Sequence, residues 1–289
     1  MLSKKKLLLA GLSLYLTLSP LTAQACTLYA AAGKDYVAGG GTLVAKNRDF
    51  RPLGDQALEL VKPTAGLRYY KLTGVVSNHA RIAVCGINEK GLYVGNSAAS
   101  NLDKDLRAAI KGFRSAENLS ATEYLLRYCS TVDEALAHKE VFRGAQNLIL
   151  ADRNKIAFVE LLPNNTHAVR TEQKGFLYHT NHYVTPEGLP FNEKVGQSSF
   201  RRYFRIGQLL AQTVKPMTIQ DFIGFSEDRH FDSTTSIYRT GKGPRSEQTL
   251  AVFIAHIPKK GSPEIYVKYR VHPDEQGKEK IIGPEKYNF

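Results

Sequence analysis

The sequence has few cysteines, and their spacing does not favour a metal site. Cys26, Cys85 and Cys129 are its only cysteines, and no two of them form the CxxC pair typical of structural zinc sites. Zinc is therefore not expected. In an oxidising compartment Cys85 and Cys129 could form a disulfide, but two buried free thiols fit the sequence equally well, and the pattern does not decide between them.

The chain also lacks the features that divide a protein into several domains. It contains no linker rich in glycine and serine or in proline, and no repeat at a fixed period. Its 289 residues are 43% hydrophobic and 23% charged, which is the balance of a water-soluble folded protein. A single domain with a substantial core is expected.

A nucleic-acid partner is not expected, although the formal net charge is +12. Lys and Arg are spread evenly, and no basic run is interleaved with aromatic residues as in proteins that bind single strands. The charge indicates a solvated surface. At most, it favours anionic envelope surfaces or substrates that carry a carboxylate.

The first 25 residues have the composition of an export signal. Three lysines at 4–6 precede an apolar stretch at 7–18, and Ala23-Gln24-Ala25 forms a small-x-small cleavage site. The apolar stretch is too short to span a bilayer, and no later segment is long and apolar enough to serve as a membrane anchor. We predict a signal peptide at 1–25, a mature domain at 26–289, and a periplasmic or secreted protein.

Hydrophobic patterns predict strands and helices grouped into runs. Strands are expected at 26–31, 42–46, 81–87, 92–95, 147–151, 156–161, 176–179, 250–257 and 264–271, and helices at 121–128, 132–139, 198–212 and 218–225. The helices at 121 and 132 each follow a capping box. The charged segment after Pro273 is expected to be a surface tail. Strands and helices that do not alternate indicate an α+β layered fold with largely antiparallel sheets.

Cys26 is the residue whose position carries the most chemical information. Cleavage after Ala25 would give Cys26 a free α-amine beside its own thiol. With reference pKa values of roughly 7.7 to 8.0 and about 8.5, the amine can accept the thiol proton while sulfur attacks a carbonyl. Two other interpretations are an ordinary cysteine and a lipoprotein cysteine, although Ala23 and Gln24 fit a lipidation site poorly.

Motifs along the chain match one enzyme family in the same order. They are CT at 26–27, KNRDF at 46–50, GINEKGL at 86–92 followed by GN at 95–96, HTNHY at 179–183, and SSxxR at 198–202. Together they resemble the N-terminal nucleophile (Ntn) cysteine hydrolases of the choloylglycine hydrolase, penicillin V acylase and acyl-CoA:6-aminopenicillanic acid acyltransferase group. Each motif alone is a weak signal.

The resemblance implies an αββα sandwich in which Cys26 begins a central strand and points into a cleft. It also implies that Asp49 hydrogen-bonds the Cys26 amine, that Asn96 and Asn181 donate amide hydrogens to the oxyanion, and that Arg202 supports the site. Local alternatives are a turn residue for Asp49 and Asn96, a strand cap for Asn181, and a solvated helix face for Arg202. His179 and His182 are three apart, so they are not expected to share a metal.

The chain departs from the family at Lys46, where bile salt hydrolases, penicillin V acylases and acid ceramidases carry arginine. Lysine supplies a point charge without a planar two-pronged donor, which weakens any transfer of bile-salt or penicillin specificity. Lys46 is a candidate substrate-binding residue. Arg48 is expected to point to the opposite face of the strand, and so not to replace the missing guanidinium.

The combined expectation is an exported hydrolase that cleaves a linear amide C–N bond of an N-acyl amide through an acyl-enzyme on Cys26, without metal or organic cofactor. Acyl transfer to a second amine is an alternative in the same class. A non-catalytic envelope lipoprotein or binding module, lipidated at Cys26, is an alternative from another class. The loops at 51–66 and 101–117 are expected to line the substrate pocket. The substrate and the oligomeric state remain open.

Overall fold

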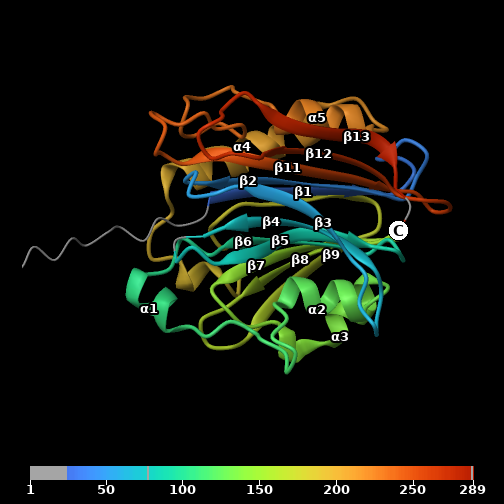
Figure 1. Cartoon of the computed structure of the whole chain (residues 1–289), viewed down its shortest axis with the longest axis horizontal. Coiled ribbons are helices and arrows are strands. Elements are labelled where there is room, and N and C mark those ends of the chain that lie inside the picture. Colours follow the sequence, from blue (N-terminus) through green and yellow to red (C-terminus); the bar gives the residue numbers. More distant parts are fainter. Residues whose placement is uncertain (1–24, 77, 288) are drawn as a thin grey trace, which may run out of the picture.

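Two antiparallel β-sheets stack face to face in the computed structural model, which describes residues 25–76, 78–287 and 289. The predicted signal peptide lies outside the described residues except for Ala25, which is the first residue of strand β1. Helices cover the outer face of each sheet, so the layers run helix, sheet, sheet, helix (Figure 1). The αββα architecture expected from the sequence motifs is confirmed.

The first sheet has six strands, and the predicted nucleophile lies at the start of one of its inner strands. In spatial order the strands are β10 (Gly175–His179), β1 (Ala25–Ala32), β2 (Thr42–Phe50), β11 (Gln248–Ile257), β12 (Glu264–Arg270) and β13 (Glu279–Lys286). All neighbours are antiparallel. Because β10 and β2 flank β1, both β10 and β2 bring residues to Cys26.

The second sheet has seven strands joined in chain order. They are β3 (Gln56–Val61), β4 (Tyr69–Val75), β5 (Arg81–Asn88), β6 (Tyr93–Ala98), β7 (Gln146–Ala151), β8 (Ile156–Leu161) and β9 (His167–Glu172). The turn between β5 and β6 forms as predicted: Asn88 Oδ1 accepts hydrogen bonds from the amides of Lys90 and Leu92, and Gly91 takes a positive φ of 89°.

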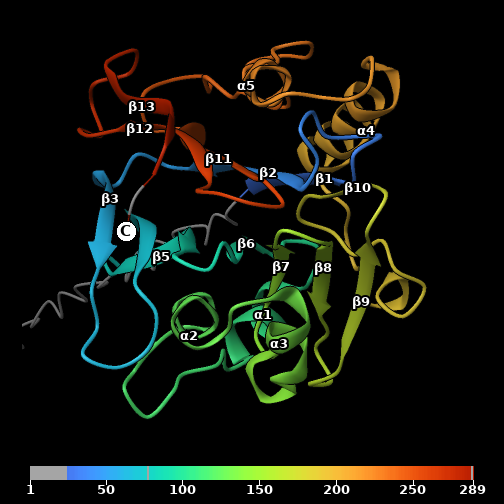
Figure 2. The same cartoon turned by 90° about the vertical axis from the view of Figure 1, so that its right-hand side faces the viewer.

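The helices divide between the two outer faces (Figure 2). Helices α4 (Gln197–Gln212) and α5 (Ile219–Ser226) cover the first sheet. Helices α2 (Ala121–Tyr128) and α3 (Val132–Ala137) cover the second sheet. The predicted caps are present, since Ser120 accepts from the Glu123 amide and Thr131 from the Glu134 amide. Helix α1 (Lys104–Ala109) and short 3-10 turns at Lys139–Val141 and Leu189–Phe191 complete the set.

Three apolar layers hold the sandwich together, and β1 contributes to two of them. Leu28 and Ala30 pack between the sheets, whereas Tyr29 and Ala31 pack against α4 and α5. A third layer lies between the second sheet and α2 and α3. Since successive residues of a strand point to opposite faces, a strand buried on both sides needs an almost continuous apolar sequence, as β1 has.

Several structured segments were not predicted, and most of them are polar or lie at an edge. Strands β3, β4 and β9 and helix α1 were absent from the expectation. The predicted tail after Pro273 is wrong, because β13 pairs with β12. Its sequence EKIIGPEK is largely exposed and carries charges and a proline, as edge strands often do. Such a strand has no alternation of buried and exposed residues that could reveal it.

The two later cysteines are free thiols in different layers. Cys85 is buried between the sheets, and Cys129 follows α2 in the layer beneath the second sheet. Burial raises the pKa of Cys85 to about 11 and that of Cys129 to about 12. Of the two alternatives that the sequence left open, the structure therefore has the inert buried thiols.

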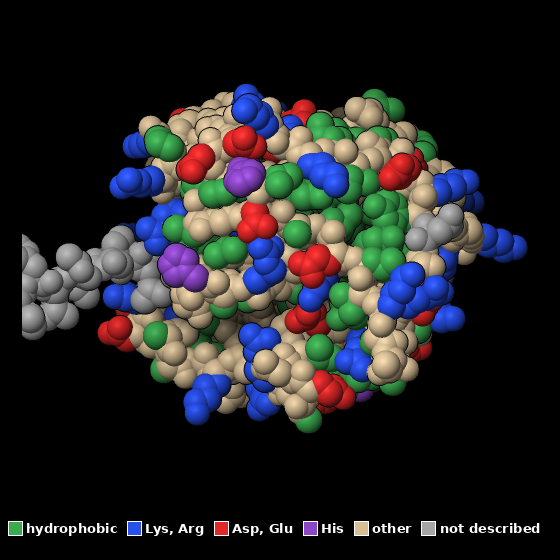
Figure 3. Space-filling view, viewed as in Figure 1, with side chains coloured by type: hydrophobic (Ala, Val, Ile, Leu, Met, Phe, Trp, Pro, Cys, Tyr) green, Lys and Arg blue, Asp and Glu red, His purple; other side chains and the backbone are tan. Residues whose placement is uncertain are grey.

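The surface has the mixed charge that the even spread of Lys and Arg in the sequence predicts. Lys and Arg side chains are interspersed with Asp and Glu over the face shown in Figure 3. Within the described part of the chain, no helix has the length and apolar character needed to cross a bilayer.

The layer between the sheets should dominate stability. Phe253 on β11 is fully buried there, and its ring meets that of Tyr93 edge-on at 5.6 Å between centroids. We expect Phe253→Ala to lower the free energy of unfolding by about 3 to 5 kcal/mol in urea titrations, because it leaves a cavity in a close-packed layer. Phe200→Ala is the control, since Phe200 is 58% exposed and should change stability by no more than ~0.5 kcal/mol. Equal effects of the two changes would contradict this assignment of the core.

Candidate active site

Cys26 is buried between the two sheets, directly beside a lysine. It is the second residue of β1 and has no exposed surface. Lys46 on β2 places Nζ 3.4 Å from Cys26 Sγ and also donates to the main-chain oxygen of Asn96. Lys46 was expected to bind substrate, but its ammonium contacts the sulfur itself. A positive charge in this position can stabilise negative charge that develops on the sulfur.

Arg48 faces the same layer as Lys46, contrary to the sequence expectation. Residues two apart on a strand share a face, so Lys46 and Arg48 both point between the sheets, whereas Asn47 and Asp49 point toward α4 and α5. Arg48 is the cross-strand partner of Cys26. Its Nε donates to Gln56 Oε1 at 2.6 Å and its Nη2 to the Val75 oxygen at 2.9 Å.

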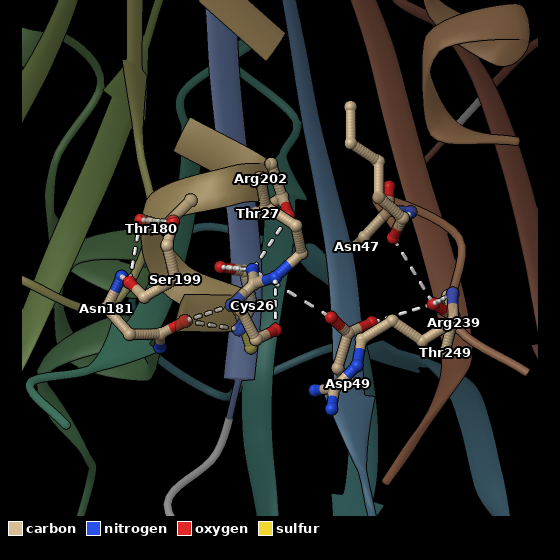
Figure 4. A network of polar contacts seen from close by, with 12 residues as sticks. Cys26, Thr27, Asn47, Asp49, Thr180, Asn181, Ser199, Arg202, Arg239 and Thr249 are labelled. Carbon is tan, nitrogen blue, oxygen red and sulfur yellow. Dashed lines mark hydrogen bonds and ion pairs between the residues drawn. The ribbon is translucent and has the colours of Figure 1, made fainter. Parts of the chain in front are cut away.

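Arg202 on α4 reaches the main chain of Cys26 from the other face of the sheet. Its Nη1 donates to the Cys26 carbonyl oxygen at 2.6 Å and to Thr27 Oγ1 at 2.9 Å, and its Nη2 donates to Asn181 Oδ1 at 2.9 Å (Figure 4). Burial lowers the pKa of Arg202 to about 10, and the nearby charge of Asp49 opposes that shift. The guanidinium is therefore still cationic at neutral pH and holds the start of β1 in place.

Asn181 contacts the nitrogen of Cys26. The Cys26 amide donates to Asn181 Oδ1 at 2.9 Å, and Asn181 Nδ2 donates to the Ala98 oxygen at 2.9 Å. Since both Cys26 and Arg202 donate to Oδ1, the orientation of the side-chain amide is fixed, and its NH₂ group points away from them. Asn181 was expected at the site, and the structure brings it there.

A cavity of about 220 Å³ adjoins this cluster. Ala25, Asn181, Lys194, Arg202 and Glu247 are among the residues that line it. The cavity lies where Asn181 and Arg202 converge on the junction between Ala25 and Cys26. A small ligand in this cavity would therefore lie next to the main chain of the predicted nucleophile.

Asp49 lies close to the cluster but bonds a different partner from the one expected. Its Oδ1 accepts from Thr249 Oγ1 at 2.7 Å, and its Oδ2 is 3.9 Å from Arg202 Nη1. Oδ2 is buried and accepts no hydrogen bond from the described residues. While Ala25 is attached, the Cys26 nitrogen bonds Asn181 and not Asp49. Burial raises the pKa of Asp49, against the lowering effect of the arginines Arg202 and Arg239.

The side chain of Asn96 does not point toward Cys26, which corrects the expected oxyanion role of its amide. Asn96 Nδ2 donates to the Ala83 oxygen at 3.2 Å and to Thr122 Oγ1 on α2 at 3.1 Å. Ser97, its neighbour on β6, instead donates to the Thr180 oxygen across the sheets. Because side chains alternate along a strand, Asn96 must face α2, and only its main-chain oxygen meets Lys46.

His179 and His182 have separate partners. His179 Nε2 lies 2.8 Å from Glu160 Oε1, and both side chains are fully buried, so the pair joins β10 of one sheet to β8 of the other. His182 Nδ1 lies 2.8 Å from Ser199 Oγ. The described residues contain no cluster of three or more His, Cys, Asp or Glu side chains that could hold a metal.

Other residues at the site were not identified individually from the sequence. Ser199 Oγ accepts from the Asn181 amide at 3.0 Å, which anchors the TNH segment to the start of α4. The SSxxR motif pointed to this region without giving the role of Ser199. Thr249 and Arg239 approach Asp49 from about 200 residues away along the chain, and no local pattern marks them.

Comparison with known proteins places this cluster in a family context. The family model described as acyl-coenzyme A:6-aminopenicillanic acid acyl-transferase matches residues 37–267. The chain belongs to this family. The resemblance drawn from the sequence motifs is confirmed, although the match begins after Cys26 and so does not bear on the nucleophile itself.

Solved structures of two kinds of enzyme share the fold of this chain. Penicillin V acylase from Agrobacterium tumefaciens aligns with a TM-score of 0.51 and 17% identity, covering 84% of this chain and 83% of that one. A variant of conjugated bile acid hydrolase from Clostridium perfringens aligns with a TM-score of 0.54 and 11% identity, covering 91% and 97%. A second variant of that hydrolase gives 13% identity. No curated protein sequence matches.

His182 should make this family member sensitive to acid. Burial, with the charges of His179 and Arg202, lowers the pKa of His182 to about 4 from 6.5. A neutral buried histidine gains its proton on unfolding, so its stabilising effect is complete above pH ~6.5 and is lost as the pH falls toward 4. Between pH 7 and 4.5, we expect the free energy of unfolding of His182→Gln to fall by up to about 3 kcal/mol less than that of the wild type, as measured by urea unfolding. Parallel pH profiles for the two proteins would contradict this assignment.

Proposed function

We propose that the mature protein is an exported amidohydrolase that begins at Cys26 and cleaves a linear amide C–N bond of an N-acyl amide through an acyl-enzyme on the Cys26 sulfur. The observation that carries the proposal is that the sulfur, the nitrogen and the carbonyl oxygen of Cys26 each contact a different side chain. Its sulfur contacts Lys46, its nitrogen donates to Asn181, and its carbonyl accepts from Arg202. Cleavage after Ala25 would convert that nitrogen from an amide into an amine at the same place.

Acylation would use Cys26 as both nucleophile and base. The α-amine takes the thiol proton, and the sulfur forms a bond to the substrate carbonyl carbon, whose oxygen becomes an oxyanion. The ammonium then returns the proton to the leaving nitrogen as the C–N bond breaks, and a thioester remains. Water adds to the thioester, the amine again accepts and returns a proton, and the carboxylic acid leaves with the thiol restored.

The surrounding residues would support these steps in different ways. The Lys46 ammonium stabilises negative charge on sulfur. Asn181 lines the cavity, and its neutral side-chain amide could stabilise an oxyanion there without giving up a proton. Asp49 Oδ2 has an unused acceptor position near the start of β1, and it would hold the ammonium once Ala25 has left.

Acyl transfer to an amine, instead of to water, is a second candidate, and the family match supports it. Both reactions share the acyl-enzyme and differ only in the group that accepts the acyl chain. The two are separated by adding a primary amine to the assay and measuring the ratio of free acid to new amide by mass spectrometry. A product that is almost entirely the new amide would favour the acyltransferase.

The mature N-terminus decides between an enzyme and a lipoprotein. Intact-mass measurement of protein isolated from the cell envelope and the medium should give a chain that starts at Cys26 without modification. A diacylglyceryl group on Cys26, or retention of residues 1–25, would contradict the proposal.

The free α-amine should be required for turnover. We expect protein that retains Gln24-Ala25, confirmed by intact mass, to hydrolyse N-acyl amides at least ~10²-fold more slowly than protein beginning at Cys26. In the extended form the Cys26 nitrogen is an amide, which cannot accept a proton near neutral pH.

Cys26→Ala and Cys26→Ser, prepared with the mature N-terminus, are the controls for this experiment. They should lose nearly all turnover and still unfold cooperatively. Equal rates for extended and mature protein, or substantial hydrolysis by Cys26→Ala, would show that Cys26 is not an N-terminal nucleophile.

Asp49→Asn should affect the rate more than substrate binding. The substitution keeps the size of the side chain and removes the charge that would orient the ammonium, so kcat should fall by about 10- to 100-fold with little change in KM. Steady-state kinetics on the mature protein measures both constants. An effect confined to KM would instead place Asp49 in the substrate pocket.

A further inference from the structure

Arg48 is the exception among the buried arginines of this protein. The described residues include four buried arginines, and three of them lie within 4 Å of a carboxylate: Arg202 at 3.9 Å from Asp49, Arg239 at 2.7 Å from Glu247, and Arg270 at 3.8 Å from Glu279. Arg48 is fully buried and has no carboxylate partner of this kind among the described residues. Its guanidinium lies 5.3 Å from the centroid of the Phe50 ring. A buried cation without a carboxylate partner is destabilising, so a bound anion would stabilise Arg48.

The guanidinium is held firmly and keeps one nitrogen without a partner. Gln56 Oε1 accepts from Nε and the Val75 oxygen accepts from Nη2, whereas Nη1 is buried and makes no hydrogen bond. Gly74 makes room for this arrangement, because a Cβ there would lie 2.5 Å from Arg48 Nε. The neighbouring strands thus fix the guanidinium plane and leave Nη1 as the donor that is not used.

This donor is close to the predicted nucleophile. Arg48 and Cys26 are direct cross-strand partners on β2 and β1. Side chains in such pairs begin about 5 Å apart, and both of these point between the sheets. Lys46 already donates to the sulfur, so a charge for the thiolate is supplied without Arg48. Arg48 Nη2 donates to Val75 on β4. Strand β4 belongs to the sheet that faces β2 (Figure 1).

We infer that Arg48 is a specificity-determining residue that binds a carboxylate, or a similar anionic group, of an N-acyl amide whose scissile carbonyl lies at Cys26. The inference rests on the proposed function and deepens it by naming the substrate class. The carboxylate would accept from Nη1 and supply the counter-charge that the folded chain does not. A guanidinium suits this role because its donors are planar and fixed.

Two pairs of probes test this inference with mature protein. N-butanoylglycine and N-butanoylglycinamide differ by a carboxylate on the leaving amine, and the mono-4-nitroanilide of succinic acid and the 4-nitroanilide of butanoic acid differ by a carboxylate on the acyl chain. For one of the two pairs, wild-type protein should hydrolyse the anionic member with a higher kcat/KM than the neutral member. Arg48→Gln should lower kcat/KM for that member by about 10- to 100-fold and change its neutral counterpart by less than about threefold.

Matched variants separate recognition from folding and from general charge. Arg48→Lys keeps the charge and should retain part of the preference. Arg170→Gln removes one positive charge from an exposed position on β9 and should change neither probe. Equal losses on anionic and neutral probes with Arg48→Gln, at unchanged thermal stability, would overturn the inference and assign Arg48 to the thiolate.

Binding to an unreactive protein distinguishes failure of this inference from failure of the proposed function. Isothermal titration of Cys26→Ala with the same probes should give tighter binding of the anionic member, and this difference should disappear in the Cys26→Ala, Arg48→Gln double variant. If the difference appears while wild type hydrolyses no amide, the proposed function fails and the Arg48 site stands. If wild type hydrolyses amides and neither kinetics nor binding depends on Arg48, the inference fails and the function stands.

Discussion

The rest of the site depends on how the main chain of Cys26 is held at the start of β1. Arg202 binds its carbonyl oxygen and Asn181 its nitrogen, and the same Arg202 also binds the Asn181 oxygen. One guanidinium therefore connects helix α4, the segment after β10 and strand β1. A residue at the very start of a strand would otherwise be free to move, and catalysis requires reacting groups fixed to well under about 1 Å. The buried arginine supplies that constraint.

The second requirement is a balance of charge inside a sandwich that is otherwise apolar. Lys46, Arg48 and Asp49 on β2 and Arg202 on α4 are all buried. Strand alternation sorts them: Lys46 and Arg48 face the other sheet, and Asp49 faces Arg202. The helix side contains charges of both signs, whereas the side between the sheets holds two cations beside a thiol. That imbalance is what a thiolate nucleophile and an anionic substrate would neutralise.

The fold could be predicted further than the site geometry, and single residues explain the difference. The side-chain caps at Ser120 and Thr131 and the turn after Asn88 are local, so they form as the sequence indicates, although neither cap is the complete reciprocal box that was predicted. Asn96 was identified as a site residue from its motif, but its amide faces α2 because its place in the alternation of β6 depends on how that strand pairs. Arg48 and Lys46 share a face because they are two residues apart on one strand, so the opposite expectation was wrong.

The sequence by itself determined the family and the layered α+β architecture, and it marked Cys26, Asn181 and Arg202 as candidate site residues, because these depend on short motifs in a fixed order and on the period of apolar residues. Only the tertiary structure decided what each side chain contacts. Lys46 Nζ contacts the Cys26 sulfur, and Asp49 accepts a hydrogen bond from Thr249. Arg48 has no carboxylate partner of the kind that the other buried arginines have. The physical reason is that these partners come from strands and loops up to 200 residues apart, and which side chains meet depends on sheet pairing and burial, which act over the whole chain.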